Sequence, residues 1–232
     1  MNKCDFTILN FDSIDSTSTY LKRSYLEHEN LTLVYALSQT NGHGRYKREW
    51  VSPKGESLLF SLLIKDKKII ENFSSLSLMA AVSIFNFLKQ FVDNVSIKWP
   101  NDVYVNDKKI AGILLESISY TDSIDALVLG IGININIKEF PLELMHKATS
   151  LALETNKIYD LSTLKGPLEG ELRKMILNIL SSDLSYLEVI RGNNYLKDKV
   201  VKAYINNQLE EVKVLDINDD NTLRVIKDDV IY

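Results

Sequence analysis

The chain has 232 residues, of which 45% are hydrophobic and 9% aromatic, so it can bury one substantial core with room for a small second domain. Its 27 lysines and arginines stand against 31 acidic residues, and the net charge of −4 argues against broad electrostatic binding to nucleic acid. The single cysteine, Cys4, excludes a disulfide framework, and the sequence has no Cys/His cluster of the kind that binds zinc.

Membrane and export signals are also missing from the sequence. No apolar run reaches the roughly 20 residues that a membrane span needs, and the first residues lack the apolar core of a signal peptide. These observations predict a soluble protein of the reducing cytoplasm that contacts neither membrane nor DNA.

The first half of the chain alternates between strand and helix patterns. Ser16 and Thr17 can cap a short helix that ends near Leu26, so small hydroxyls are expected at a strand-helix junction. A polar loop with two glycines, 41–49, separates two apolar strands. The patterns predict strands at 6–11, 31–39 and 58–64 and a core helix at 73–92.

The second half begins with short strands and continues with helices. Strands are predicted near 95–99, 103–105, 109–116 and 126–135, followed by a loop that bears Pro141. A helical region at 161–180 should be interrupted at Gly166-Pro167, and a weaker helix is predicted at 184–196. This order favours an α+β fold in which helices back a mixed or antiparallel sheet.

The last stretch changes to short β-rich runs at 200–205, 209–217 and 223–226, joined by asparagine-rich turns. They suggest a small antiparallel barrel. We therefore predict two domains, residues 1–197 and residues 198–232.

The polar loop is the first candidate for chemistry. Two glycines, Gly42 and Gly44, free its backbone, while Arg45, Lys47 and Arg48 supply cationic donors that could surround a phosphate. An ordinary solvated turn explains the glycine spacing equally well, because short glycine patterns recur by chance.

Lys109 is the second candidate. Strand alternation places it on one face with Ala111 and Ile113, so its charged end needs an anionic partner, which could be a ligand carboxylate, a phosphate or Asp102. A lysine that extends its ammonium group to water from a strand end is the alternative.

The third candidate is Gly130-Ile-Gly-Ile-Asn134. Glycines in a core strand permit the close approach of a ligand or of another part of the backbone. The segment is not a dinucleotide fingerprint, because a third glycine and a following helix are missing. Packing alone could also explain it.

Together, five segments resemble the biotin protein ligases in content and in order. They are Ser16-Thr17, the Gly-x-Gly-Arg loop that ends at Trp50, Lys98-Trp-Pro-Asn-Asp, Lys109-x-x-Gly-Ile-Leu-x-Glu and Gly130-x-Gly-x-Asn. The resemblance is close over residues 6–136. It implies a biotin/lipoate ligase catalytic domain of the class II synthetase type, and the β-rich tail resembles the family's small SH3-like barrel.

The resemblance also implies which residues act. The catalytic set would be Arg45, Asp102 and Lys109. The ATP-binding set would be Arg45, Lys98, Asn101, Asp102 and Asn134. The biotin-binding set would be Ser16, Thr17, Ser18, Gln39, Gly42, His43, Gly44, Arg45, Trp50, Lys109 and Gly112.

Three positions depart from the family pattern. Ser18 stands where asparagine is more common, His43 replaces an arginine, and Lys47 stands where glycine is common. Trp50 could serve in core packing as well as in binding, whereas we interpret Trp99 as structural.

The activity implied by the resemblance is a two-step ligase reaction. ATP and Mg²⁺ would activate biotin as biotinyl-5'-AMP, and biotin would then pass to a lysine of a biotin carboxyl carrier protein or domain. The chain opens on the first strand of the catalytic domain, so no DNA-binding domain is expected, and a homodimer is possible. The alternatives are a lipoate or octanoate ligase or transferase of the same superfamily, and a non-catalytic biotin-binding regulator.

Overall fold

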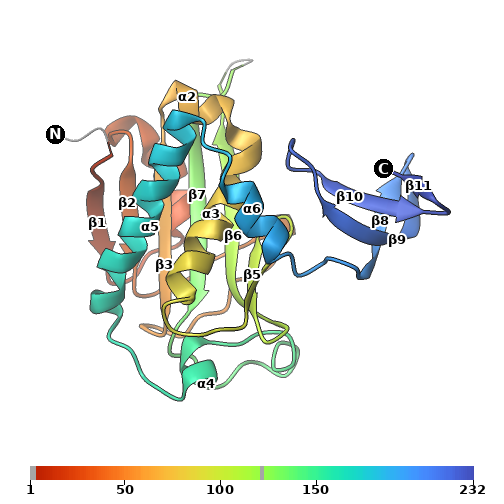
Figure 1. Cartoon of the computed structure of the whole chain (residues 1–232). Coiled ribbons are helices and arrows are strands. Elements are labelled where there is room, and N and C mark those ends of the chain that lie inside the picture. Colours follow the sequence, from red (N-terminus) through yellow and green to blue (C-terminus); the bar gives the residue numbers. More distant parts are fainter. Residues whose placement is uncertain (1–3, 121–122) are drawn as a thin grey trace.

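Two β-sheets organise the described residues, 4–120 and 123–232, of this computed structural model (Figure 1). The larger sheet has the strand order β1-β2-β3-β7-β6-β5-β4, in which β1 and β2 are parallel and the other neighbours antiparallel. The predicted mixed sheet is therefore confirmed. Its strands are β1 (Thr7–Phe11), β2 (Thr32–Ala36), β3 (Ser57–Ile64), β4 (Val95–Lys98), β5 (Asp102–Val105), β6 (Lys108–Ile118) and β7 (Ala126–Asn134).

Helices cover both faces of this sheet. Side chains alternate along a strand, so Leu62 of β3 joins the main core on one face while Leu63 joins a smaller cluster on the other. The main core lies under α3 (Phe73–Leu88) and α5 (Leu161–Ser181), which pass in front of the sheet in Figure 1. The smaller cluster lies under α1 (Thr17–Ser24). Thus α1, which begins with the predicted hydroxyl run, lies on the face opposite the main helices.

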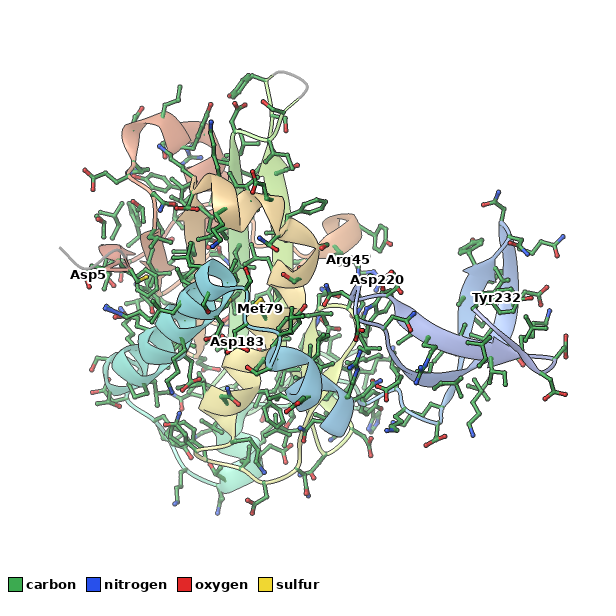
Figure 2. All side chains as sticks on the ribbon, turned by 45° about the horizontal axis from the view of Figure 1, so that its top comes forward. Asp5, Arg45, Met79, Asp183, Asp220 and Tyr232 are labelled. Atoms are coloured by element: carbon green, nitrogen blue, oxygen red, sulfur yellow. The ribbon has the colours of Figure 1, made fainter. Side chains whose placement is uncertain are left out.

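The core helix predicted at 73–92 is present as α3, preceded by the short α2 (Lys67–Glu71). Met79 of α3 is 4% exposed and lies among the side chains in the middle of the molecule (Figure 2). None of the helices in the described residues is long and apolar enough to cross a membrane.

The predicted interruption at Gly166-Pro167 is wrong, because α5 continues through Pro167. A proline at this position removes the hydrogen bond to the Thr163 carbonyl. Thr163 and Pro167 are both exposed, so water can satisfy that carbonyl. On the side of the helix that faces the sheet, Leu164 and Leu168 are buried in the main core, and this packing outweighs the local preference.

The helix predicted at 184–196 is shorter, α6 (Tyr186–Gly192). Beyond it the chain becomes extended along the edge of β4, where Ile97 N–H donates to Asn193 O at 2.9 Å and Tyr195 N–H donates to Ile97 O at 2.9 Å. The backbone after α6 therefore covers a sheet edge. The short helix predicted to end near Leu26 is present as α1 and the 3₁₀ turn η1 (Tyr25–Glu27), whereas α4 (Leu151–Thr155) and the 3₁₀ turn η2 (Arg45–Lys47) do not follow from the sequence patterns.

The C-terminal residues form the expected antiparallel β-structure, with strands β8 (Val200–Ile205), β9 (Gln208–Ile217), β10 (Leu223–Lys227) and β11 (Val230–Ile231). Their order is β11-β10-β9-β8, so among the described residues they make an open sheet and β11 does not pair with β8. Asn206 and Asn207 turn the first hairpin with φ of 49° and 66°. The division at residue 198 stays a prediction.

Trp99 joins the two sheets. Its indole N–H donates to Asn221 O at 2.9 Å, and its ring packs against clusters of both sheets. These contacts agree with the structural role predicted for Trp99.

Candidate active site

The predicted site residues converge on one cavity of about 520 Å³. It opens on the α1 side of the large sheet, and segments from both halves of the chain line it. Every predicted site residue lines it except Gly42. The lining set from the predictions is Ser16, Thr17, Ser18, Gln39, His43, Gly44, Arg45, Trp50, Lys98, Asn101, Asp102, Lys109, Gly112 and Asn134.

Glycines form the floor of the cavity. Gly112 of β6 pairs with Gly132 of β7, and the Trp50 ring lies directly on this pair. A Cβ atom at Gly132 would come within 2.5 Å of the Trp50 ring, and one at Gly112 within 2.9 Å. The predicted close approach is therefore present, and the group that approaches is an aromatic side chain.

The start of α1 supplies the first wall. Ser16 is the N-cap and accepts from Thr19 N–H at 3.4 Å, and it turns the next two residues inward. Thr17 and Ser18 are 3% and 6% exposed. Gln39 Oε1 accepts from both Thr17 N–H, at 2.7 Å, and Thr17 Oγ1–H, at 3.1 Å. The polar side chains at this end of the cavity are thus held by one another.

Asp15 anchors this wall from outside. Burial alone would raise the pKa of its carboxyl, but hydrogen bonds from the Ser16 backbone and from Arg23 hold that pKa below its usual value. The Arg23–Asp15 ion pair joins the last turn of α1 to the residue before its N-cap.

Ser61 is a polar residue of this region that the sequence analysis missed. It lies on β3, is fully buried, and its Oγ is 2.8 Å from both Thr17 Oγ1 and Ser18 Oγ. The available signal was a hydroxyl between Leu59 and Leu63 on one face of an apolar strand, a face that also carries Ser57.

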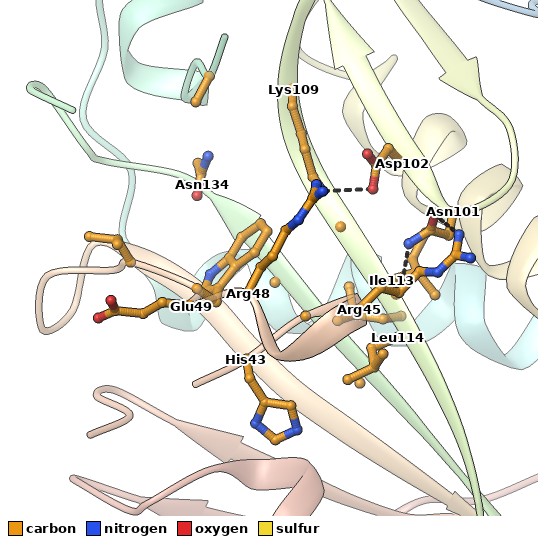
Figure 3. A pocket seen from close by; sticks show the side chains of 18 of the residues that line it. His43, Arg45, Arg48, Glu49, Asn101, Asp102, Lys109, Ile113, Leu114 and Asn134 are labelled. Atoms are coloured by element: carbon orange, nitrogen blue, oxygen red, sulfur yellow. Dashed lines mark hydrogen bonds and ion pairs between the residues drawn. The ribbon is translucent and has the colours of Figure 1, made fainter. Parts of the chain in front are cut away.

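A half-buried charge pair lines the cavity. Lys109 Nζ of β6 lies 2.7 Å from Asp102 Oδ1 of β5, and the two side chains point toward each other in Figure 3. Lys109 also lies 5.6 Å from the centre of the Trp50 ring. Of the partners considered for Lys109, the structure supplies Asp102, and the pair remains open to the cavity with side chains 31% and 21% exposed.

The loop at 41–50 covers one side of the cavity. Arg45 donates to Asn101 Oδ1 at 3.2 Å, which joins the loop to the Lys-Trp-Pro-Asn-Asp segment (Figure 3). Tyr46 is 80% exposed and left-handed, with φ of 58°, and the guanidinium groups of Arg45 and Arg48 lie over its ring at 5.3 and 6.0 Å. The left-handed residue of the loop is therefore Tyr46. The side chain of Lys47 lies outside what the structure describes.

Gly42 supports the loop without lining the cavity. Its carbonyl accepts from Trp50 N–H at 3.0 Å, and a Cβ atom there would come within 2.9 Å of Gln39 Nε2. A side chain at this position would therefore displace the Gln39 amide.

His43 also departs from the family pattern. Its Nδ1 is 3.3 Å from Asn41 O and its Nε2 is 4.0 Å from Glu116 Oε2. Glu116 is at the same time paired with Lys22 of α1 at 2.7 Å. The histidine therefore faces the carboxylate that closes the Lys109 motif.

Two asparagines also line the cavity. Asn101 Nδ2 donates to Ile113 O at 2.7 Å, and Asn134 Nδ2 donates to Thr149 O at 3.0 Å. The Asn134 side chain is buried, and its Oδ1 has no partner among the described residues, so it is an acceptor available to a ligand. Lys98 also lines the cavity, and its Nζ donates to Tyr104 Oη at 3.0 Å.

The segment that follows β7 completes the wall, and the sequence analysis had assigned it only as a loop. Lys109 N–H donates to Lys147 O at 2.8 Å and Thr149 N–H donates to Lys109 O at 2.9 Å, so this segment runs beside the catalytic lysine candidate. Its lining residues are Phe140, Leu144, Lys147 and Ala148. Across residues 4–120 and 123–232, no group of three His, Cys, Asp or Glu side chains could hold a metal ion.

The geometry agrees with comparisons against known proteins. The profile of the Biotin/lipoate A/B protein ligase family matches residues 10–134, which is just over half of the chain. The bifunctional ligase/repressor BirA of Bacillus subtilis is 39% identical over 124 residues, covering 52% of this chain and 38% of that protein. The Escherichia coli protein of the same name is 32% identical over 161 residues, covering 69% of this chain and 50% of that protein. The chain thus spans at most about half the length of these two relatives.

Solved structures extend the similarity over the whole chain. The biotin protein ligase of Aquifex aeolicus, solved in complex with biotin and ATP, is 27% identical with a TM-score of 0.87. The alignment covers 97% of this chain and 94% of that one, so it includes the C-terminal sheet. With the profile match over the strands and loops that form the cavity, this similarity shows that the chain belongs to the biotin/lipoate A/B protein ligase family.

Proposed function

We propose that this chain is an ATP-dependent biotin protein ligase that forms biotinyl-5'-AMP and transfers biotin to a lysine of a biotin carboxyl carrier protein or domain. The observation that carries the proposal is that three kinds of group line one cavity: fixed hydroxyl and amide groups, the Lys109–Asp102 pair, and the amides of Asn101 and Asn134. These groups complement the three parts of biotinyl-AMP, which are the ureido ring, the acyl phosphate and the adenosine. The Aquifex aeolicus neighbour, solved with biotin and ATP, supports the same assignment.

The hydroxyl end would bind the biotin ring. A cyclic urea carries two N–H donors and one carbonyl acceptor, and it gains affinity only where each meets a partner in a desolvated site. Ser16, Thr17, Ser18 and Gln39 offer both kinds of group, and Gly112 leaves room above the floor. Trp50 would pack against the ligand.

Activation requires two anions to meet, the biotin carboxylate and the α-phosphate of ATP. Lys109 and Arg45 are the cations that would offset this repulsion and stabilise the charge that develops as pyrophosphate leaves. Magnesium commonly binds through substrate phosphates with one or two carboxylates, and the carboxylates of Asp102 and Glu49 line the cavity. Bound magnesium would share the stabilisation of the pyrophosphate leaving group.

Transfer requires a neutral amine. The lysine of the carrier attacks the acyl carbon of the mixed anhydride, AMP leaves with the bonding electron pair, and the amine loses a proton. Asp102 is the carboxylate closest to Lys109 and would orient this amine or accept its proton.

The direct test is to incubate the purified chain with biotin, Mg-ATP and a biotin carboxyl carrier domain and to measure the mass of the carrier. We expect the mass to rise by that of one biotinyl group, and a carrier with its target lysine changed to arginine is the control. An unmodified wild-type carrier, shown to be active with another ligase, would refute the proposal.

The same assay separates the remaining candidates. Lipoate or octanoate in place of biotin, with a lipoyl domain as acceptor, tests the alternative acyl transfer reactions. Pyrophosphate release that depends on biotin excludes a non-catalytic biotin-binding regulator. The cytoplasmic location, the homodimer and the absence of DNA binding remain predictions that this assay does not address.

A further inference from the structure

Ser61 occupies the centre of a chain of buried side-chain hydroxyls. Its Oγ lies 2.8 Å from Thr17 Oγ1 on one side and 2.8 Å from Ser18 Oγ on the other. All three side chains are buried, and Thr17 continues the chain to Gln39 Oε1 at 3.1 Å. These contacts link β3, α1 and the start of the polar loop.

Gln39, the partner at the end of this series of hydroxyls, fixes the direction of the hydrogen bonds. The amide oxygen of Gln39 can only accept, so the single proton of Thr17 Oγ1 points to Gln39. Thr17 must then accept from Ser61, and Ser61, having used its own proton, must accept from Ser18. The protons therefore run from Ser18 to Ser61, to Thr17, to Gln39.

This direction determines what the cavity offers to a ligand. Ser18 and Thr17 have used their protons inside the protein, so they present only lone pairs, which accept from N–H groups. Gln39 Oε1 already accepts from Thr17 N–H and Oγ1–H, which leaves the Gln39 amide N–H groups as donors at the same end. Acceptors beside a donor complement a cyclic urea, whereas a saturated acyl chain would leave them without partners.

We propose that Ser61, which is absent from the predicted biotin-binding set, is a positioning residue that makes this end of the cavity selective for a cyclic urea. It acts by holding the Ser18 and Thr17 hydroxyls in the accepting orientation before the ligand arrives. The proposal rests on the proposed biotin ligase function and adds to it a source of specificity.

Gly130 is a second position at which a substitution can test the same series of hydrogen-bonded hydroxyls. It lies on β7 under α1, and a Cβ atom there would come within 2.4 Å of Ser18 Oγ but only within 3.5 Å of Ser61 Oγ. Gly130→Ala would therefore displace the first hydroxyl and leave the Ser61–Thr17 bond in place.

The test is the affinity for biotin measured by calorimetry in the full chain without ATP, followed by steady-state kinetics. We expect Ser61→Ala to raise the Kd and the KM for biotin about tenfold, because the hydroxyls lose their fixed orientation, while kcat and the KM for ATP change by less than about twofold. Dethiobiotin, which keeps the urea and lacks the sulfur, should lose the same factor. Gly130→Ala should shift the biotin constants in the same direction.

Ser83→Ala is the matched control. Ser83 is a buried serine whose hydroxyl bonds to Met79 O in α3 and Glu171 O in α5, outside the cavity lining. It should leave the biotin constants unchanged. The proposal is overturned if folded Ser61→Ala binds biotin like the wild type, if biotin but not dethiobiotin is affected, or if Ser83→Ala has the same effect.

The binding and kinetic measurements separate the two proposals. A wild-type chain that binds biotin but releases no pyrophosphate would refute the ligase function, while the Kd values would still decide the role of Ser61. A wild-type chain that binds no biotin would refute both. If Ser61→Ala does not fold, Gly130→Ala decides, and an unchanged Kd in that variant overturns the proposal.

Discussion

The two ends of the cavity differ in how their side chains are held. At the hydroxyl end Thr17, Ser18 and Ser61 are buried and bond to one another. In the loop at 41–50, Arg45, Tyr46 and Arg48 are exposed, and the side-chain hydrogen bond from Arg45 to Asn101 reaches across the cavity. One end is organised by contacts within the protein, and the other presents charged groups to solvent.

This difference matches the two tasks of the proposed reaction. Recognition of a neutral ring depends on fixed hydrogen-bond geometry, which a buried network provides before the ligand binds. Covering a charged adenylate requires a segment that can admit the ligand and then shield it from water. We therefore expect changes at the charged pair and in the loop to alter chemistry, and changes at the floor to alter binding.

Lys109→Ala should have the largest effect. The variant removes the cation that, in the proposed reaction, would face both anions, and it removes the partner of Asp102, so biotin-dependent pyrophosphate release should fall about 100-fold to 1000-fold. Lys108→Ala, which removes the neighbouring lysine of β6 outside the cavity lining, is the control. Equal rates for the two variants would remove Lys109 from the catalytic set.

Asp102→Asn should act mainly on transfer. With purified biotinyl-adenylate, biotinylation of the carrier should slow by about 100-fold if the carboxylate accepts or orients the proton of the amine. An unchanged rate of transfer from preformed adenylate would show that the assignment is wrong. Single-turnover assays keep this step apart from adenylate formation.

Arg45→Gly should weaken the hold of the loop at 41–50 over the cavity. Because the hydrogen bond to Asn101 is lost, the adenylate should escape, and the fraction free in solution should rise about tenfold in a filtration assay. Lys54→Gly is the control. Lys54 is an exposed cation just after the loop, and within residues 4–120 and 123–232 its ion-pair partner is Asp12. Retention of the adenylate by Arg45→Gly would contradict the proposed role of the loop.

Gly132→Ala should have the smallest effect of the four. Its Cβ atom would come within 2.5 Å of the Trp50 ring, so the ring must shift, and the KM values for biotin and ATP should rise a few-fold, about 1 kcal/mol or less each. Trp50 fluorescence, followed in a Trp99→Phe background, should report the shift. In Gly170→Ala no atom lies within 4 Å of the added Cβ, so the emission should be unchanged.

Local patterns predicted most of the elements, because apolar spacing and turn residues act over a few positions. The hairpin at Asn106-Asp107 is an example: both residues have positive φ, which asparagine and aspartate tolerate. The continuation of α5 through Pro167 could not be predicted in this way. It depends on which side of the helix faces water, and only packing against the sheet decides that.

The sequence by itself determined the class of fold, the motifs and their order, and hence the family, because these reside in residue types and spacings. Tertiary structure alone decided that Lys109 is paired with Asp102, that the floor glycines make room for Trp50, and that Ser61 joins two hydroxyls of α1. Each of these contacts joins residues on different strands, helices or loops. Sheet register and helix position set such contacts, and neither is encoded in local spacing.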